Sequence, residues 1–212
     1  LRKPYASAPD TPPIASAALN VEQQAAFDSL YAQYQSGKPS AALLYGVTGS
    51  GKTQVYMNLI DRVIADGRHV LVLVPEISLT PQMMALFLGR YGRRVAVLHS
   101  GLSIGERMDE WKRIKRGQAQ ITVGTRSAVF APCGDLGLIV MDEEQEHTYK
   151  SEASPRYRAR DVARFRCAKH KAMLLLTSAT PSVETFHAAK SGRYSLEILR
   201  SRYGDAQLPS VE

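Results

Sequence analysis

The stretch GVTGSGKT at residues 46–53 has the spacing of a phosphate-binding loop. It matches the pattern G-x-x-x-x-G-K-[ST], whose glycines let successive backbone N–H groups point into one concavity that binds phosphate oxygens. A helix that begins near Gly51 would add the positive end of its dipole, Lys52 would contact the β- and γ-phosphates, and the Thr53 hydroxyl would coordinate magnesium. A chance match in a glycine-rich turn is the alternative, and an apolar strand before the motif disfavours it. The expected nucleotide-binding residues are Gly46, Val47, Thr48, Gly49, Ser50, Gly51, Lys52 and Thr53.

Two carboxylates follow an apolar run in LGLIVMDEEQE, residues 136–146. Asp142 would hold magnesium through water, and Glu143 would orient or deprotonate the attacking water. A kinase does not need a second carboxylate at this position, whereas a hydrolase does. A solvated acidic run that caps the strand is the alternative. The sequence therefore predicts nucleotide hydrolysis, with Lys52, Asp142 and Glu143 as catalytic residues and with Thr53 and Asp142 as metal ligands.

A basic and aromatic stretch follows the acidic pair. Residues 156–171, RYRARDVARFRCAKHK, hold five arginines and two lysines against one aspartate. Aromatic rings can stack on bases and arginines can neutralise phosphates, which favours a nucleic-acid role for residues 149–157. The alternative is a solvated amphipathic helix with Val162, Phe165 and Cys167 turned inward. We prefer that alternative for the cationic residues Arg164, Arg166 and Lys169.

The elements that position these residues alternate along the chain. Apolar runs predict strands at residues 40–45, 69–74, 94–99, 120–124, 136–141, 172–177 and 194–199. Helical spacing and capping residues predict helices at residues 20–37, 53–67, 80–92, 103–117, 158–171 and from 182. Most of the strands are continuous apolar runs, as expected of strands buried on both faces of a parallel sheet. The predicted fold class is α/β, with a mostly parallel sheet and helices on both faces.

Composition sets outer limits on the function. The chain has 212 residues, 44% hydrophobic and 22% charged, with a net charge of +7 that is compatible with a polyanionic partner. No apolar run approaches the roughly 20 residues that cross a bilayer, so no membrane role is expected. Cys133 and Cys167 are expected to be reduced thiols of a cytoplasmic protein. Trp111 has Met108 and Ile114 at helical spacing and is expected in the core.

The order of the motifs resembles superfamily 2 helicases, and several phrases resemble the PriA family of replication-restart helicases within it. The resemblance covers residues 19–190 and rests on LNVEQ, LLYGVTGSGKTQVY, LVLVPEISLTPQ, LHSGLSIGER, VGTRSAVFAP, DEEQEHTYK, PRYRARDVA and LTSATPSVET. It implies a RecA-like P-loop NTPase lobe, using ATP and Mg²⁺, from an ATP-driven 3′-to-5′ DNA helicase in replication restart. The implied partners are single-stranded and forked DNA and, in the parent protein, primosome and single-strand-binding proteins.

The resemblance also assigns further residues. Gln23 would contact the adenine edge, although Gln23 also fits the N3 position of a capping box begun by Asn20. The residues implied for DNA contact or for coupling DNA to the nucleotide are Thr125, Arg126, Tyr149, Lys150, Arg156, Tyr157, Ser178 and Thr180. Two positions depart from the family pattern, because Gln145 and Arg158 stand where histidines are expected. Gln145 can form hydrogen bonds but cannot carry a proton, so only the detail of coupling there is in doubt.

The resemblance also predicts the domain organisation. Residues 1–18, with four prolines, are expected to be an extended lead-in, residues 19–200 the first helicase lobe, and residues 201–212 the start of a linker. We expect this chain to be a piece of a longer protein. The piece is expected to lack the second lobe and the zinc-binding cysteines of the family, and to hydrolyse ATP poorly alone. A translocase of repair or restriction systems and a DNA-binding adaptor that binds nucleotide without hydrolysis are the competing functions.

Overall fold

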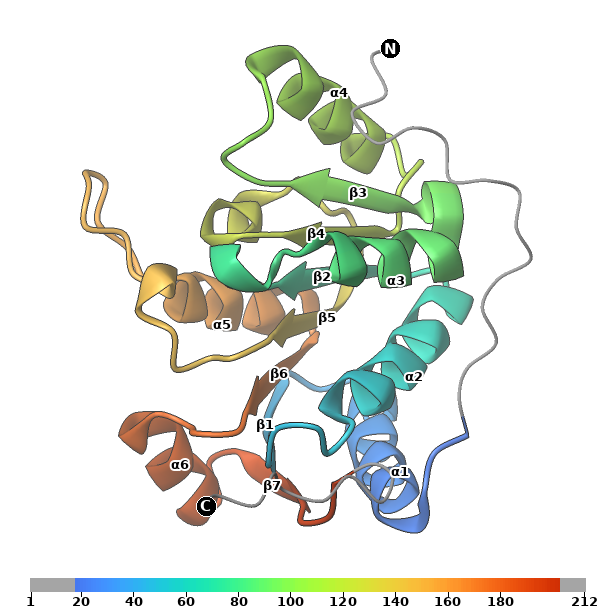
Figure 1. The fold of residues 1–212 in the computed structure, drawn as a ribbon, viewed down its shortest axis with the longest axis vertical. Helices are drawn as coiled ribbons and strands as arrows, with labels where there is room; N and C mark the ends of the chain where they lie inside the picture. The colour runs from blue at the N-terminus through green and yellow to red at the C-terminus, as the bar shows by residue number, and fades with distance from the viewer. Residues whose placement is uncertain (1–17, 203–212) are drawn as a thin grey trace, which may run out of the picture.

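A seven-stranded parallel sheet forms the centre of the lobe in a computed structural model that describes residues 18–202. The strand order is β3-β4-β2-β5-β6-β1-β7, and every pairing is parallel. Figure 1 shows the strands in this order from top to bottom. The strands are β1 (Ser40–Gly46), β2 (His69–Leu73), β3 (Val95–Leu98), β4 (Ile121–Gly124), β5 (Leu136–Met141), β6 (Met173–Ser178) and β7 (Ser195–Leu199).

Helices cover both faces of the sheet. The α-helices are α1 (Val21–Gln35), α2 (Lys52–Ala65), α3 (Pro81–Tyr91), α4 (Ile104–Lys115), α5 (Ala159–His170) and α6 (Val183–Lys190). One buried cluster joins α1, α2 and α3 to one set of strand side chains, and a second joins α4, α5 and α6 to the alternate set. Short 3₁₀ turns complete the described part: η1 (Glu76–Ser78), η2 (Gly92–Arg94), η3 (Arg126–Phe130) and η4 (His147–Tyr149).

The predicted elements are confirmed. Each predicted strand is present, and its ends differ from the prediction by at most one residue. The strands are buried along almost their whole length because helices lie on both sides, which explains their continuous apolar sequences. The α/β fold class is also confirmed, and the sheet is parallel throughout the described residues. The predicted lead-in (residues 1–18) and linker (residues 201–212) fall almost entirely outside the described residues.

The prediction that two residues are buried in the core is wrong. Trp111 is 36% exposed on α4, because Glu110 and Ile114 occupy the buried face of that helix. Phe165 is 70% exposed on α5, where Ala159, Ala163 and Cys167 face the sheet instead. Small side chains on α5 let its backbone approach the sheet closely. The buried positions of α5 are Ala159, Ala163 and Cys167, and Phe165 is not on that face of the helix. Both cysteines are free and buried.

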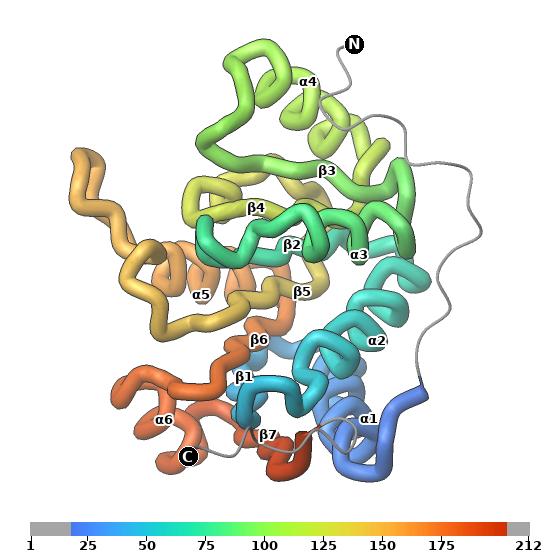
Figure 2. Tube along the Cα trace, viewed as in Figure 1, coloured from blue at the N-terminus to red at the C-terminus, as the bar shows by residue number. Residues whose placement is uncertain are grey.

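A hairpin projects from the lobe between η4 and α5. Residues 150–158, termed the basic hairpin, begin and end at an antiparallel bridge between Lys150 and Arg158. The Ser151 amide also donates to the Tyr157 carbonyl at 2.8 Å. The basic hairpin is the arm that extends to the left of the tube in Figure 2.

Candidate nucleotide site

Three sequence motifs meet at the carboxyl ends of three adjacent strands. The phosphate loop follows β1, the carboxylates follow β5, and the Ser178–Thr180 segment follows β6, which lies between them. The register places Tyr45 beside Ser178 and Met141 beside Leu176, so the three strands end at nearly the same level. Ligands of open α/β sheets bind at this edge.

The phosphate loop has the conformation that its glycines allow. Gly49 and Gly51 have φ angles of +80° and +83°, a region that favours glycine. A Cβ on Gly46 would lie 2.6 Å from the Ser50 hydroxyl, so only glycine fits there. Lys52 at the start of α2 donates from Nζ to the Gly46 carbonyl at 2.7 Å. The exposed residues Val47, Thr48 and Gly49 leave the loop open to solvent.

Two buried polar groups of this loop suit a phosphate ligand. The Ser50 hydroxyl is buried and has no hydrogen-bond partner among residues 18–202. Burial lowers the pKa of the Lys52 ammonium, and the nearby carboxylates of Glu143 and Asp142 oppose that shift. A triphosphate would give the ammonium an anionic partner in place of the loop carbonyls. The residues present therefore fit a nucleotide.

Asp142 is buried and is held by residues of two other elements. The Thr177 hydroxyl of β6 donates to its Oδ1, and the Tyr56 hydroxyl of α2 lies 3.5 Å from its Oδ2. Burial raises the pKa of the Asp142 carboxyl above its ordinary value, while the hydrogen bond from Thr177 lowers it. Because Tyr56 and Lys52 belong to the same helix, Asp142 lies next to the phosphate-binding helix.

A hydrogen-bonded chain joins the carboxylate loop to the segment after β6. Gln145 donates from Nε2 to Glu143 Oε2 at 2.9 Å and accepts at Oε1 from the Ser178 hydroxyl at 2.6 Å. The Thr180 amide in turn donates to the Ser178 hydroxyl at 2.8 Å. Glu143 has a φ of +47°, which is uncommon for a residue with a side chain and marks a constrained position. Gln145 thus connects two of the predicted functional segments.

Gln23 packs beneath the phosphate loop. Its Nε2 donates to the Ser50 carbonyl at 3.0 Å, and its Oε1 accepts from the Asn20 amide at 3.0 Å. The second bond completes a capping box, which confirms that alternative for Gln23. Gln23 is fully buried, so its amide supports the loop in this conformation. Contact with adenine stays a prediction and would require the amide to leave these partners.

The predicted metal ligands have oxygen donors, which suit magnesium. Thr53 lies in the first turn of α2, and Asp142 lies at the end of β5 against that helix. In residues 18–202 there is no group of three or more histidine, cysteine, aspartate or glutamate side chains that could hold a metal by themselves. Magnesium here would therefore depend on the nucleotide phosphates and water for its other ligands.

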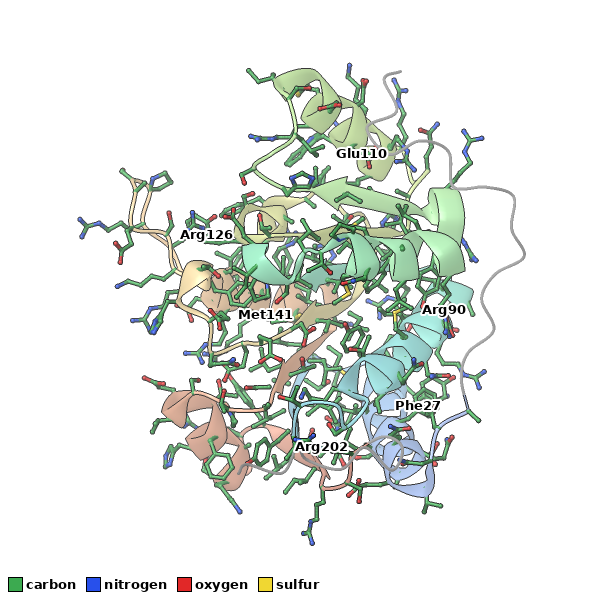
Figure 3. The ribbon with its side chains drawn as sticks, viewed as in Figure 1. Phe27, Arg90, Glu110, Arg126, Met141 and Arg202 are labelled. Carbon is green, nitrogen blue, oxygen red and sulfur yellow. The ribbon has the colours of Figure 1, made fainter. Side chains whose placement is uncertain are left out.

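Three of the predicted DNA residues are not free surface groups. Tyr149 is buried, and its hydroxyl donates to the carbonyls of Leu73 and Asp142 at 2.9 and 2.7 Å. Thr125 is buried in the wall of a surface cavity of about 640 Å³. Arg126 donates to the Lys150 carbonyl at 2.6 Å, and Figure 3 shows it beside the base of the basic hairpin. Tyr149 therefore does not offer its ring to DNA in this structure, and its predicted role in coupling DNA to the nucleotide stays a prediction.

Three more of the predicted DNA residues lie on the basic hairpin. Lys150 and Arg156 are exposed, and Tyr157 is half-buried between the Arg126 guanidinium and the Phe130 ring. They border a surface cavity of about 500 Å³ that also contains acidic side chains. The hairpin thus presents cations beside an aromatic ring, the combination that binds single-stranded nucleic acid.

Sequence reasoning did not assign two residues that position Asp142, nor an ion pair that lies next to the carboxylate loop. Tyr56 and Thr177 position Asp142, while Glu144 and Arg160 form a buried ion pair at 3.5 Å. Thr177 gave a detectable signal, because a polar residue inside an apolar strand usually has a buried partner. The contact between Glu144 and Arg160 depends on tertiary packing and has no sequence signature.

Fold and site together define a P-loop nucleotide-hydrolase lobe of the helicase type. The chain belongs to the DEAD/DEAH box helicase family, whose model matches residues 20–188. It is similar to the replication restart protein PriA of Bacillus subtilis, with 48% identity over 91% of this chain and 24% of that protein. It is also similar to PriA of Synechocystis, with 51% identity over 80% of this chain and 21% of that protein. The chain therefore spans about a quarter of the length of these relatives.

Solved structures show the same fold at lower identity. RecG bound to a three-way DNA junction matches 92% of this chain and 25% of that chain, with a TM-score of 0.68 and 21% identity. The helicase domain of Hef from Pyrococcus furiosus matches 84% of this chain and 38% of that chain, with a TM-score of 0.57 and 21% identity. Among residues 18–202, no helix is both long and apolar enough to span a membrane.

Proposed function

We propose that this chain is the ATP-binding lobe of an ATP-dependent 3′-to-5′ DNA helicase that acts in replication restart and primosome assembly at stalled forks. One observation carries the proposal: the phosphate loop and the Asp142–Glu143 pair meet at one edge of the sheet, with Tyr56 of the phosphate-binding helix beside Asp142. The similarity to PriA proteins supports the replication-restart context.

Each residue of the site has a role in this proposal. The loop amides and Lys52 hold the phosphates, and Gln23 supports the loop and is the candidate adenine contact. Thr53 and Asp142 hold magnesium, which when bound neutralises the charge that develops on the phosphates. Glu143 orients the attacking water and accepts its proton.

The proposed partners are single-stranded and forked DNA, which the basic hairpin would contact through Lys150, Arg156 and Tyr157. Primosome and single-strand-binding proteins are proposed partners of the longer protein in the cytoplasm. Zinc is expected in that longer protein and not in this chain. The arginine that completes hydrolysis in helicase motors comes from a second lobe, so the longer protein is the proposed active form.

Nucleotide binding can be tested on the 212-residue chain itself. A fluorescent ATP analogue with Mg²⁺ is expected to bind, and Lys52→Ala is expected to weaken binding about tenfold or more, because the phosphates lose a charged hydrogen-bond donor. Lys38→Ala, which removes an exposed lysine outside the loop, is the matched control. Equal binding by the chain and by Lys52→Ala would remove the basis of the proposal.

Unwinding can be tested on the longer protein that carries this lobe. A forked DNA with a 3′ single-stranded tail is expected to be unwound with ATP, and Glu143→Gln is expected to lower kcat by about 10²-fold or more while ATP still binds. Movement on duplex DNA without strand separation would favour a translocase. Normal DNA binding with no hydrolysis in the wild type would favour an adaptor.

A further inference from the structure

A buried polar cluster joins the start of α5, the start of α6 and the carboxylate loop. Glu144 is buried and lies directly after the water-orienting Glu143. Its carboxylate accepts from the Ser182 amide at 2.7 Å and from the Thr185 hydroxyl at 2.9 Å, and it pairs with Arg160 at 3.5 Å. Arg160 also donates to the Thr185 hydroxyl at 2.8 Å. The cluster of Glu144, Arg160, Ser182 and Thr185 is termed the latch.

The latch is connected along the chain both to the basic hairpin and to the segments of the nucleotide site. On one side, Arg160 comes two residues after Arg158, which closes the hairpin by its bridge to Lys150. On the other side, Ser182 follows the Ser178–Thr180 segment, and Ser178 is hydrogen-bonded to Gln145. A displacement of the hairpin base would therefore shift Arg160. Through the latch, that shift would reach Glu144, which follows Glu143, and the segment that connects Ser178 to Ser182.

The polar and charged groups of the latch suit it to transmit a displacement between segments rather than only to stabilise the fold. Burying a carboxylate and a guanidinium carries a desolvation cost that an apolar contact between two helices would avoid. Directional, charge-assisted hydrogen bonds fix the relative position of three segments, which an apolar contact does less sharply. The Arg160 side chain is 20% exposed, whereas the Glu144 side chain is fully buried.

We propose that Glu144, Arg160 and Thr185 are positioning residues through which DNA bound at the basic hairpin stimulates ATP hydrolysis. The inference rests on the proposed function and assigns its coupling path. None of the three residues is required to touch ATP or DNA. Their loss should therefore lower the maximal stimulation by DNA and leave the affinities for both ligands in place.

Thr185→Val in the longer protein gives the sharpest test. Thr185 is 1% exposed, so it cannot contact DNA, and valine keeps its shape while removing the hydroxyl hydrogen bonds to Glu144, Arg160 and Ser182. Maximal stimulation of ATPase by single-stranded DNA is expected to fall about fivefold or more. Hydrolysis without DNA, the KM for ATP and the DNA concentration for half-stimulation are expected to stay within about twofold.

Arg160→Gln is the second variant and carries the test if Thr185→Val does not fold. It is expected to show the same loss, and Arg160→Lys is expected to restore part of the stimulation because it keeps the charge. The control is Glu110→Gln, which breaks another buried glutamate–arginine pair, with Arg113, on α4 away from the hairpin. It should lower the melting temperature without changing DNA stimulation.

The outcomes separate the two proposals. A wild-type protein whose ATPase does not respond to DNA would overturn the proposed function and the latch with it. A stimulated wild type with undiminished stimulation in Thr185→Val or Arg160→Gln would overturn the latch alone. Loss of stimulation in Glu110→Gln as large as in the latch variants would also overturn it, because general destabilisation would then account for the effect.

Discussion

Gln145 joins Glu143, the proposed water-orienting residue, to Ser178 at the end of β6, because a primary amide can donate and accept at once. Its NH₂ group meets the Glu143 carboxylate, and its carbonyl meets the Ser178 hydroxyl. The sequence resemblance predicted a histidine here and left the consequence of glutamine open. The observed bonds require one donor and one acceptor, which glutamine supplies at any pH.

Substitutions at Gln145 should separate geometry from charge. Gln145→Ala removes both bonds and is expected to lower kcat of the longer protein about tenfold. Gln145→Glu keeps the shape but places a second carboxylate against Glu143, so it is expected to lower kcat further than alanine does. Steady-state ATPase assays would check the order. A glutamate variant more active than the alanine variant would contradict the amide's role as the donor to Glu143.

His69 should make stability depend on pH. Burial lowers the pKa of His69 below its ordinary 6.5, with Asp135 opposing the shift, and within the described part of the chain its buried Nδ1 has no hydrogen-bond partner. The folded protein therefore holds the neutral form where the unfolded chain already binds a proton. The free energy of unfolding should fall as pH decreases through 6.5 towards the lower folded pKa. Urea unfolding between these pH values should show this slope, and His69→Gln should reduce it.

Burial also lowers the pKa values of His99 and His170, so the slope should decrease without vanishing in that variant. The rise in the pKa of Glu197 acts in the opposite direction, because it favours the folded state as the solution becomes more acidic. That contribution belongs to the pH range near and above the ordinary glutamate pKa of 4.5. A free energy of unfolding that rises as pH falls through 6.5 would contradict the assignment to histidine.

Among the elements, strand β3 lies at the edge of the sheet that residues 18–202 form, and a helix side chain covers part of that edge. Glu110 of α4, labelled in Figure 3, accepts from the Val97 amide at 3.0 Å, and Arg113 holds its carboxylate. The exposed N–H groups of an edge strand can pair with other chains, so this contact satisfies one of them inside the lobe. Trp111 lies exposed partly because Glu110 takes the inward position.

Glu110→Ala should therefore destabilise the lobe. The Val97 amide would lose its acceptor, and the free energy of unfolding is expected to fall by about 1–3 kcal/mol. Glu152→Ala on the exposed basic hairpin is the matched control and should change stability by less than about 0.5 kcal/mol. Chemical denaturation of both variants would measure the difference. Equal stability of the two would mean that water replaces the carboxylate without cost.

Elements were more predictable from the sequence than contacts between them. The strand ends were correct because apolar runs such as residues 136–141 stop at charged or glycine residues, and capping residues such as Asn20 marked helix starts. The phosphate loop and Asp142 followed from local spacing. The latch, the Tyr149 hydroxyl bonds and the exposed Phe165 did not, because they depend on how segments distant in sequence pack together.

At the scale of the whole molecule, the proposed nucleotide site lies at the carboxyl ends of the strands. The phosphate loop residues Val47, Thr48 and Gly49 are exposed, so the described residues leave that side of a bound nucleotide uncovered. Helicase motors hydrolyse ATP between two lobes, with an arginine from the second lobe at the transition state. This chain alone should therefore bind ATP but hydrolyse it slowly.

The 212-residue chain is expected to bind ATP but to hydrolyse it at least about 10³-fold more slowly than the DNA-stimulated longer protein, given the usual contribution of such an arginine. Phosphate release assays on both proteins, with and without single-stranded DNA, would measure this ratio. Lys52→Ala in each serves as the background. Rapid, DNA-stimulated turnover by the chain alone would show that this lobe carries a complete catalytic site.

Strand β7 connects the end of the described residues directly to the phosphate loop. It pairs with β1 at the outer edge of the sheet, and a Cβ on Gly46, the first residue of the phosphate loop, would lie 2.9 Å from the Leu199 Cβ. The next amides, of Arg200 and Ser201, donate to Glu22 at the start of α1, one residue before Gln23. Tension applied to the backbone after Leu199 would thus reach the nucleotide pocket from two directions, without crossing the other five strands.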